Sequence, residues 1–120
     1  MKRKYDFNIT QQVSETLAVE IVDDLGQARN LSSYSFKLDC RQGPQSSEAF
    51  FSLSSDDGTI VLDNSINNKI WLIFLHELTK TLNFDKGLYD LLAYAPDKSH
   101  VEVLMSGAVT LNKTVTRIEN

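Results

Sequence analysis

The sequence is poor in cysteine, which forms disulfides, and in histidine, which together with cysteine binds zinc. It has one cysteine, Cys40, and two histidines among its 120 residues. A single cysteine excludes an intramolecular disulfide and any zinc site built from several cysteines. His76-Glu77 begins like the metalloprotease motif His-Glu-x-x-His, but Lys80 stands where the second histidine would be, and a cation there would repel the metal. The other histidine, His100, belongs to a separate segment, so we expect no metal site and no cofactor.

Long hydrophobic runs are also missing. The longest, residues 70–75, is far shorter than the ~20 apolar residues that a membrane-spanning helix needs. The first four residues, which include Lys2, Arg3 and Lys4, are basic like the start of a signal peptide, but residues 5–12 mix polar with apolar side chains. The sequence therefore predicts neither a secretion signal nor a membrane span, and we expect the protein to be made and kept in a cytoplasm.

Positive charge and glycine-rich loops are scarce as well. Twelve Lys and Arg against sixteen Asp and Glu give a net charge of −4, and the isoelectric point is about 5.0. Nonspecific binding to nucleic acid depends on clustered Lys and Arg, so this balance argues against a nucleic-acid partner. The five glycines are isolated, which excludes a glycine-rich phosphate loop; they are Gly26, Gly43, Gly58, Gly87 and Gly107.

The remaining candidate catalytic groups have simpler explanations. Cys40 alternates with apolar residues of a predicted strand, so we expect a small buried side chain and no nucleophile, since no general base accompanies it. The pairs Asp23-Asp24 and Asp56-Asp57 stand in turns near glycine, where Asp is favoured for backbone reasons. We therefore predict no catalytic, cofactor-binding or metal-binding residues, and expect that the protein is not an enzyme.

What the sequence does have is strands. The chain is 42% hydrophobic and 23% charged, which is typical of a globular protein, and its length predicts a single domain over residues 1–120. Apolar and polar residues alternate in many short segments, the pattern of half-buried strands. The predicted strands cover residues 5–9, 17–22, 34–41, 50–53, 59–62, 69–75, 87–95, 101–104 and 108–118.

The connections between these strands carry their own signals. Asp57-Gly58 predicts a hairpin that joins residues 50–53 to residues 59–62. A short helical turn is expected across residues 76–82, and Gly107 is expected to mark a bulge or bend between the last two strands. About seven to nine short strands, with a turn signal every 8–12 residues or so, indicate an antiparallel sandwich or barrel.

One motif sharpens this fold class. Asp85-Lys86-Gly87-Leu88-Tyr89 resembles the Asp-x-Gly-x-Tyr corner of immunoglobulin-like domains, in which a buried tyrosine donates its hydroxyl hydrogen to nearby backbone. We therefore predict that Asp85, Gly87 and Tyr89 form a structural corner, with the Tyr89 hydroxyl bonded within about six residues upstream. Leu91 stands where antibody domains have a cysteine. The predicted fold is an all-β, antiparallel immunoglobulin-like sandwich with one short helical turn, and another β-sandwich or a barrel is the alternative.

A longer series of short motifs extends from about residue 16 to residue 117. The motifs are Asp24-Leu25-Gly26-Gln27-Ala28-Arg29-Asn30-Leu31, Tyr34-Ser35-Phe36-Lys37-Leu38 with Arg41, Gly58-Thr59-Ile60, Ile70-Trp71-Leu72, Gly87-Leu88-Tyr89-Asp90-Leu91, Met105-Ser106-Gly107-Ala108-Val109-Thr110 and Val115-Thr116-Arg117. In this order the chain resembles small tail or baseplate-associated proteins of bacteriophages and prophages, and is similar to the N-terminal domain of the upper baseplate proteins of lactococcal phages.

That resemblance implies a structural protein of the virion that acts through protein–protein contacts as an attachment module. Its expected partners are other tail proteins, and further copies of itself through an edge strand at residues 5–9. It would move from the host cytoplasm into the virion. The alternative function is a small sandwich that binds a ligand or carbohydrate, for which Trp71, Tyr34 and Tyr94 offer stacking faces.

Overall fold

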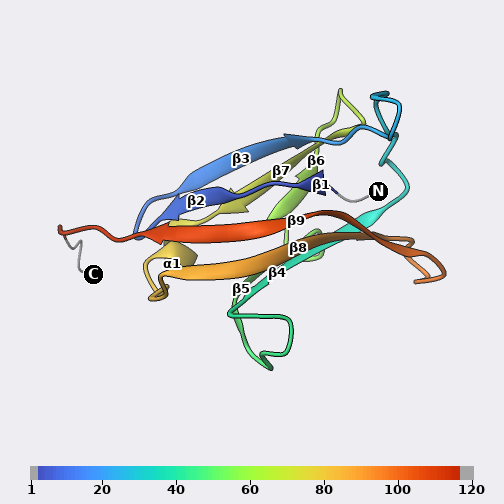
Figure 1. The fold of residues 1–120 in the computed structure, drawn as a ribbon. Helices are drawn as coiled ribbons and strands as arrows, with labels where there is room; N and C mark the ends of the chain where they lie inside the picture. The colour runs from blue at the N-terminus through green and yellow to red at the C-terminus, as the bar shows by residue number, and fades with distance from the viewer. Residues whose placement is uncertain (1–2, 117–120) are drawn as a thin grey trace.

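The strands of the protein form two facing sheets (Figure 1). The structure, a computed structural model, describes residues 3–116. Its elements are β1 (Arg3–Lys4), β2 (Phe7–Thr10), β3 (Glu15–Glu20), β4 (Ser35–Arg41), β5 (Ala49–Ser54), β6 (Ile60–Leu62), β7 (Lys69–Phe74), α1 (His76–Thr79), β8 (Lys86–Tyr94) and β9 (Val101–Asn112).

The larger sheet has the order β1-β9-β8-β4-β5, with β2 following β1 along the same edge of β9. The smaller sheet has the order β3-β7-β6. Neighbouring strands run antiparallel except at one edge, where β1 and β2 run parallel to β9. The prediction of a wholly antiparallel architecture is therefore wrong at that edge. A parallel pair needs a long connection, and here nearly the whole chain separates the two strands.

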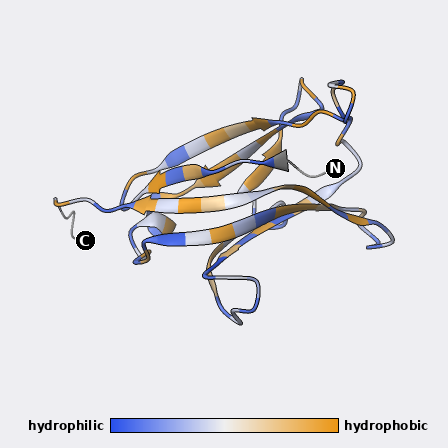
Figure 2. Cartoon of the chain, in the orientation of Figure 1, coloured by the Kyte–Doolittle hydropathy of each residue, from blue (hydrophilic) through white to orange (hydrophobic). Residues whose placement is uncertain are grey.

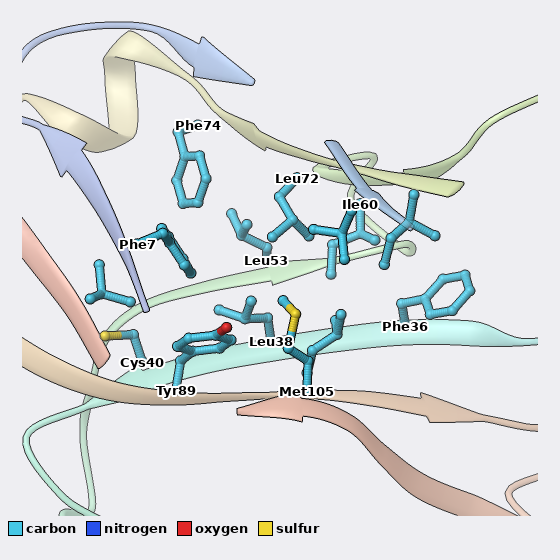
Figure 3. Packing of buried hydrophobic residues seen from close by; sticks show 14 of the residues in the cluster. Phe7, Phe36, Leu38, Cys40, Leu53, Ile60, Leu72, Phe74, Tyr89 and Met105 are labelled. Atoms are coloured by element: carbon cyan, nitrogen blue, oxygen red, sulfur yellow. The ribbon is translucent and has the colours of Figure 1, made fainter. Parts of the chain in front are cut away.

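The core lies between the sheets and is supplied by alternate residues of each strand. In β4, Phe36, Leu38 and Cys40 are buried while the residues between them face outward. Figure 2 shows the same alternation of hydrophobic and hydrophilic residues along other strands. Seen from close by, the buried side chains from both sheets meet in one cluster (Figure 3). Composition and periodicity thus predicted the all-β class and the inward faces correctly.

Two predicted connections differ from the structure. The segment containing Asp57-Gly58 does not close a hairpin, because β5 pairs with β4 in one sheet and β6 pairs with β7 in the other. Gly58 still has the left-handed backbone expected of such a turn, with φ +81°. The turn signal was correct locally, but the pairing of the strands is decided by which sheet each one buries its face against.

The end of the chain differs in a second way. The two strands predicted over residues 101–104 and 108–118 are one strand, β9, which passes through Gly107 without a break and ends at Asn112. The predicted strand was therefore wrong over residues 113–116. The register shift lies instead between Leu91 and Leu92 of β8, which pair with Met105 and Val103. The predicted helical turn is confirmed as the short α1. Lys2 of the basic start, and residues 117 and 118 of the predicted last strand, lie outside the described residues.

Candidate functional site

The predicted corner residues lie at the start of β8 and on the strand itself. Asp85 precedes β8, and its carbonyl oxygen accepts the Leu111 N–H at 3.1 Å. Gly87 faces the core, where a Cβ atom would lie 2.7 Å from the Cys40 Sγ atom. Tyr89 is 4% exposed, as predicted. The glycine is required because any side chain at position 87 would collide with the buried thiol.

The hydrogen-bond partner of Tyr89 is not the one predicted. Its hydroxyl donates to the Tyr5 carbonyl oxygen at 2.6 Å, so the partner lies in the N-terminal segment and not a few residues upstream. The ring contacts Phe7 edge to face, with centroids 5.0 Å apart. The Tyr89 side chain therefore reaches past Gly107 of β9 to the edge of the same sheet, where the N-terminal segment lies. A sequence motif defined by local spacing gave no sign of so distant a partner.

The acceptor carbonyl lies at a break between β1 and β2. Arg3 pairs with Met105 and Phe7 pairs with Val109, so the register is the same on both sides of the break. At the break the Tyr5 N–H donates to the Ser106 carbonyl oxygen at 2.8 Å. An Asp6 carboxylate oxygen accepts the Ala108 N–H at 2.9 Å, in the place of a backbone acceptor. This substitution leaves the Tyr5 carbonyl to turn toward Tyr89.

Gly107 makes this arrangement possible. A Cβ atom built on Gly107 would lie 2.1 Å from the Tyr5 carbonyl oxygen and 2.8 Å from an Asp6 carboxylate oxygen. Contacts that short do not occur, so any other residue would displace the N-terminal strand. We call Tyr5, Asp6, Tyr89 and Gly107 the N-terminal latch, because together they attach β1 and β2 to β9. The sequence predicted a special role for Gly107 but assigned it to a bend.

Tyr89 of the latch and the neighbouring Cys40 are buried, ionisable side chains that are held in their neutral forms. Burial, with a smaller contribution from the Asp6 carboxylate, raises the pKa of Tyr89 well above its usual value. Burial also raises the pKa of the Cys40 thiol to about 12. A thiol that stays protonated at neutral pH is a poor nucleophile, and Cys40 is fully buried as expected. The neutral Cys40 thiol therefore packs in the core, and the neutral Tyr89 hydroxyl can donate its hydrogen bond to Tyr5.

A shallow hollow of about 550 Å³ lies on the outer face of the larger sheet, bordered by Gly43 and Pro44 of the loop after β4. It is lined by charges of both signs, from Lys4, Asp6, Asp39, Arg41, Lys86 and Asp90. The Asp39 carboxylate accepts hydrogen bonds from Ser52 at 2.7 Å and Arg41 at 3.0 Å. Burial raises the pKa of Asp39, but these two bonds and the positive charges of Lys37 and Arg41 together outweigh burial and lower the pKa. Because Asp39 and Arg41 already satisfy each other, the hollow presents no concentrated charge to a ligand.

The three aromatic residues considered for carbohydrate stacking do not share a surface. Trp71 lies on β7 of the smaller sheet, where its indole N–H donates to an Asp63 carboxylate oxygen at 3.1 Å. Tyr94 ends β8 in the other sheet. Tyr34 lies before β4, with its ring 6.2 Å from that of His100. Within residues 3–116 no ring contact joins any two of the three stacking candidates, so each would offer a separate stacking face.

The described residues contain neither a metal-binding cluster nor a membrane-spanning helix. Over residues 3–116, no three His, Cys, Asp or Glu side chains are grouped in a way that could hold a metal ion. In the same part of the chain, no helix is long and apolar enough to cross a membrane.

The chain matches no protein-family model and no curated protein.

Proposed function

We propose that the two sheets form an immunoglobulin-like sandwich. In that fold one sheet carries strands G, F, C and C′, and the facing sheet carries B, E and D. In chain order, β3 to β9 take the places of B, C, C′, D, E, F and G. The order β9-β8-β4-β5 opposite β3-β7-β6 then follows the immunoglobulin arrangement. Tyr89, near the start of the F-like strand β8, also occupies the position of the corner tyrosine.

On this fold we propose a structural role in a phage or prophage tail, without enzymatic activity. The protein would be made in the host cytoplasm and then join other tail proteins through protein–protein contacts. The support is the resemblance of residues 16–117 to the N-terminal domain of phage upper baseplate proteins, combined with what the motif residues do. Gly26 and Gly58 both adopt left-handed backbone, with φ +80° and +81°. Gly87 and Gly107 leave room for close contacts in the core and at the latch.

The observation that carries this proposal is the structural use of those motifs. Residues shared with a catalytic family would be expected to converge on a pocket with perturbed acids and bases. Here Gly26 and Gly58 lie at turns, Gly87 and Gly107 lie at close contacts, and Tyr89 is buried in the core, so each of them has a structural use. Motifs of this kind suit a module whose shape and surfaces are its function.

The test is incorporation into particles. Induction of the host that carries the gene, followed by purification of tails and mass spectrometry, should find the protein in a fixed ratio to known tail proteins. Gly107→Ala, which collides with Tyr5, should reduce incorporation, whereas Gly43→Ala should not, because open space surrounds Gly43. If the protein stays in the soluble fraction while complete tails form, the proposed role is wrong.

A further inference from the structure

Strand β3 has one neighbour in the structure. Among residues 3–116 it pairs with β7, in an unbroken antiparallel register from Glu15 opposite Phe74 to Glu20 opposite Lys69. The Ile21 N–H donates to the Asn68 carbonyl oxygen at 2.9 Å, so Ile21 continues the hydrogen-bonded pairs of this ladder. Because such pairs alternate along a strand, the N–H and C=O groups of Thr16, Ala18 and Glu20 face away from β7, toward the free edge.

The other edges of the two sheets are less suited to pairing. β6 has three residues. The ladder of β5 with β4 is interrupted by a register shift at Cys40 and Arg41. The edge formed by β1 and β2 is broken at Tyr5 and Asp6. β3, in contrast, has six residues without proline, lysine or a bulge, and its two charged residues, Glu15 and Glu20, stand only at its ends.

We propose that β3 pairs with β3 of a second copy of this chain, antiparallel and related by a two-fold axis at Ala18. This register uses every edge-facing residue: Ala18 pairs with Ala18 of the other copy, and Thr16 pairs with Glu20 in both directions. Each such pair exchanges two backbone hydrogen bonds. The result would be a continuous sheet of the order β6-β7-β3 followed by the same strands in reverse.

The side chains of β3 fit this symmetric partner. The Glu20 carboxylate would face the Thr16 hydroxyl of the other copy, so no like charges are opposed. Thr16, Ala18 and Glu20 are exposed, and alanine is small enough to lie opposite itself without collision. A partner with a carboxylate opposite Glu20 would be repelled, so the charge pattern favours self-pairing over pairing with an acidic strand.

The outer face of the smaller sheet supports the same register. Ala18 lies beside Trp71, which lies beside Val61, so these three side chains form a row across the strands. Trp71 is fixed there by Asp63 and by the Lys69 ammonium group, 4.6 Å from the ring centroid. A two-fold axis at Ala18 would join two such rows end to end, with the two tryptophan backbones about 14 Å apart across three strand spacings. The alanine pair would leave space between the rings.

The dimer should be weak when isolated. Pairing along one strand edge buries less surface than the standard interface of about 1,600 Å², so we expect association in the micromolar range or weaker. Sedimentation analysis over a wide range of concentrations should show a reversible monomer–dimer equilibrium. A protein that remains monomeric at all concentrations would overturn the proposal, and β3 would then be left for an extended segment of another protein.

Cysteine cross-linking tests the register directly. The native Cys40 is fully buried, so a cysteine introduced on β3 is the accessible thiol. Ala18→Cys should form covalent dimers under mild oxidation, because the two Cα atoms of a hydrogen-bonded pair lie about 5.5 Å apart. Thr16→Cys is the matched control, equally exposed on the same strand, and its two copies would lie about 14 Å apart. Efficient cross-linking of Thr16→Cys, or none by Ala18→Cys, would overturn the proposed pairing.

A charge exchange gives a second readout. Ala18→Lys and Ala18→Glu each place like charges opposite each other and should abolish the dimer, while a mixture of the two variants should form heterodimers. Melting temperatures should stay near that of the parent, because Ala18 is exposed. Dimers that survive in both single variants would contradict an axis at Ala18. These outcomes do not depend on the tail role, which particle incorporation tests separately.

Discussion

Tyr89→Phe isolates the hydrogen bond at the centre of the N-terminal latch. The substitution keeps the ring and its contact with Phe7 and removes the hydroxyl that donates to the Tyr5 carbonyl at 2.6 Å. Leaving a buried partner unsatisfied costs about 1–3 kcal/mol. Tyr5 itself is 42% exposed, so water can partly replace the lost donor. We therefore expect a decrease of about 1–2 kcal/mol in the free energy of unfolding.

This loss is large enough to measure by thermal unfolding. The entropy of unfolding is about 2.1 cal/mol/K per residue, which for 120 residues gives about 0.25 kcal/mol/K. Each kcal/mol then lowers the melting temperature by about 4 °C, so Tyr89→Phe should melt about 4–8 °C below the parent. Tyr94→Phe is the matched control on the same strand, half-buried, and within residues 3–116 no hydrogen bond is recorded for its hydroxyl. Its melting temperature should be unchanged.

Hydrogen exchange can place the effect within the fold. Loss of the latch bond should speed exchange of the β2 amides paired with β9 more than exchange of the amides paired between β4 and β8. If Tyr89→Phe melts with the parent and β2 exchanges at the parental rate, the hydroxyl contributes nothing and the account of the latch is refuted.

Three further predictions concern the latch, the core thiol and a surface ion pair. Gly107→Ala should lower the free energy of unfolding by about 2 kcal/mol or more in denaturant titration, because its Cβ would meet the Tyr5 carbonyl at 2.1 Å, whereas Gly43→Ala should be neutral. Burial raises the pKa of the Cys40 thiol to about 12 in the folded protein, against a value near 9 in the unfolded chain. The stability that the protonated thiol contributes is complete below about pH 9 and is lost as the pH rises toward about 12. Cys40→Ala should therefore lose less stability than the parent at alkaline pH. The hydrogen bond from Arg29 lowers the pKa of Glu102. The stability that this ionised carboxylate contributes is present above about pH 4.5 and is lost as the pH falls. Glu102→Gln should therefore make stability less dependent on pH in acid, and should cost less than about 1 kcal/mol near neutral pH.

Features that depend on local periodicity could be predicted from the sequence. The pairing between strands that are distant in the sequence could not. Alternation in β4 identified Phe36, Leu38 and Cys40 as core residues, because side-chain direction in a strand follows from position alone. The same information cannot say that β5 and β6 join different sheets, since that depends on which face each strand buries. It also cannot place the Tyr5 carbonyl beside Tyr89, because the contact joins residues 84 apart.

At the candidate surfaces, too, local features were predicted correctly and the pairing of distant strands was not. The corner motif correctly predicted that Tyr89 would be buried, because an Asp-x-Gly-x-Tyr spacing carries its own backbone requirement. The free edge of β3 was not predicted, although its alternation was visible, because a strand does not reveal from sequence whether it has one neighbour or two. The edge strand predicted at residues 5–9 is β2, which lies at the edge of the larger sheet beside β9.

The pairing of β1 and β2 with β9 constrains the order in which the strands can pair during folding. Arg3 pairs with Met105 and Thr10 with Asn112, so β1 and β2 cannot complete their pairing until β9 has been synthesised. Until β9 is available, Phe7 and Ile9 have no sheet edge to join, although both are buried in the finished fold. Closure over nearly the full chain is a slow, nonlocal step. A chain arrested before β9 would therefore carry an unpaired, apolar N-terminal segment available to chaperones or to other nascent chains.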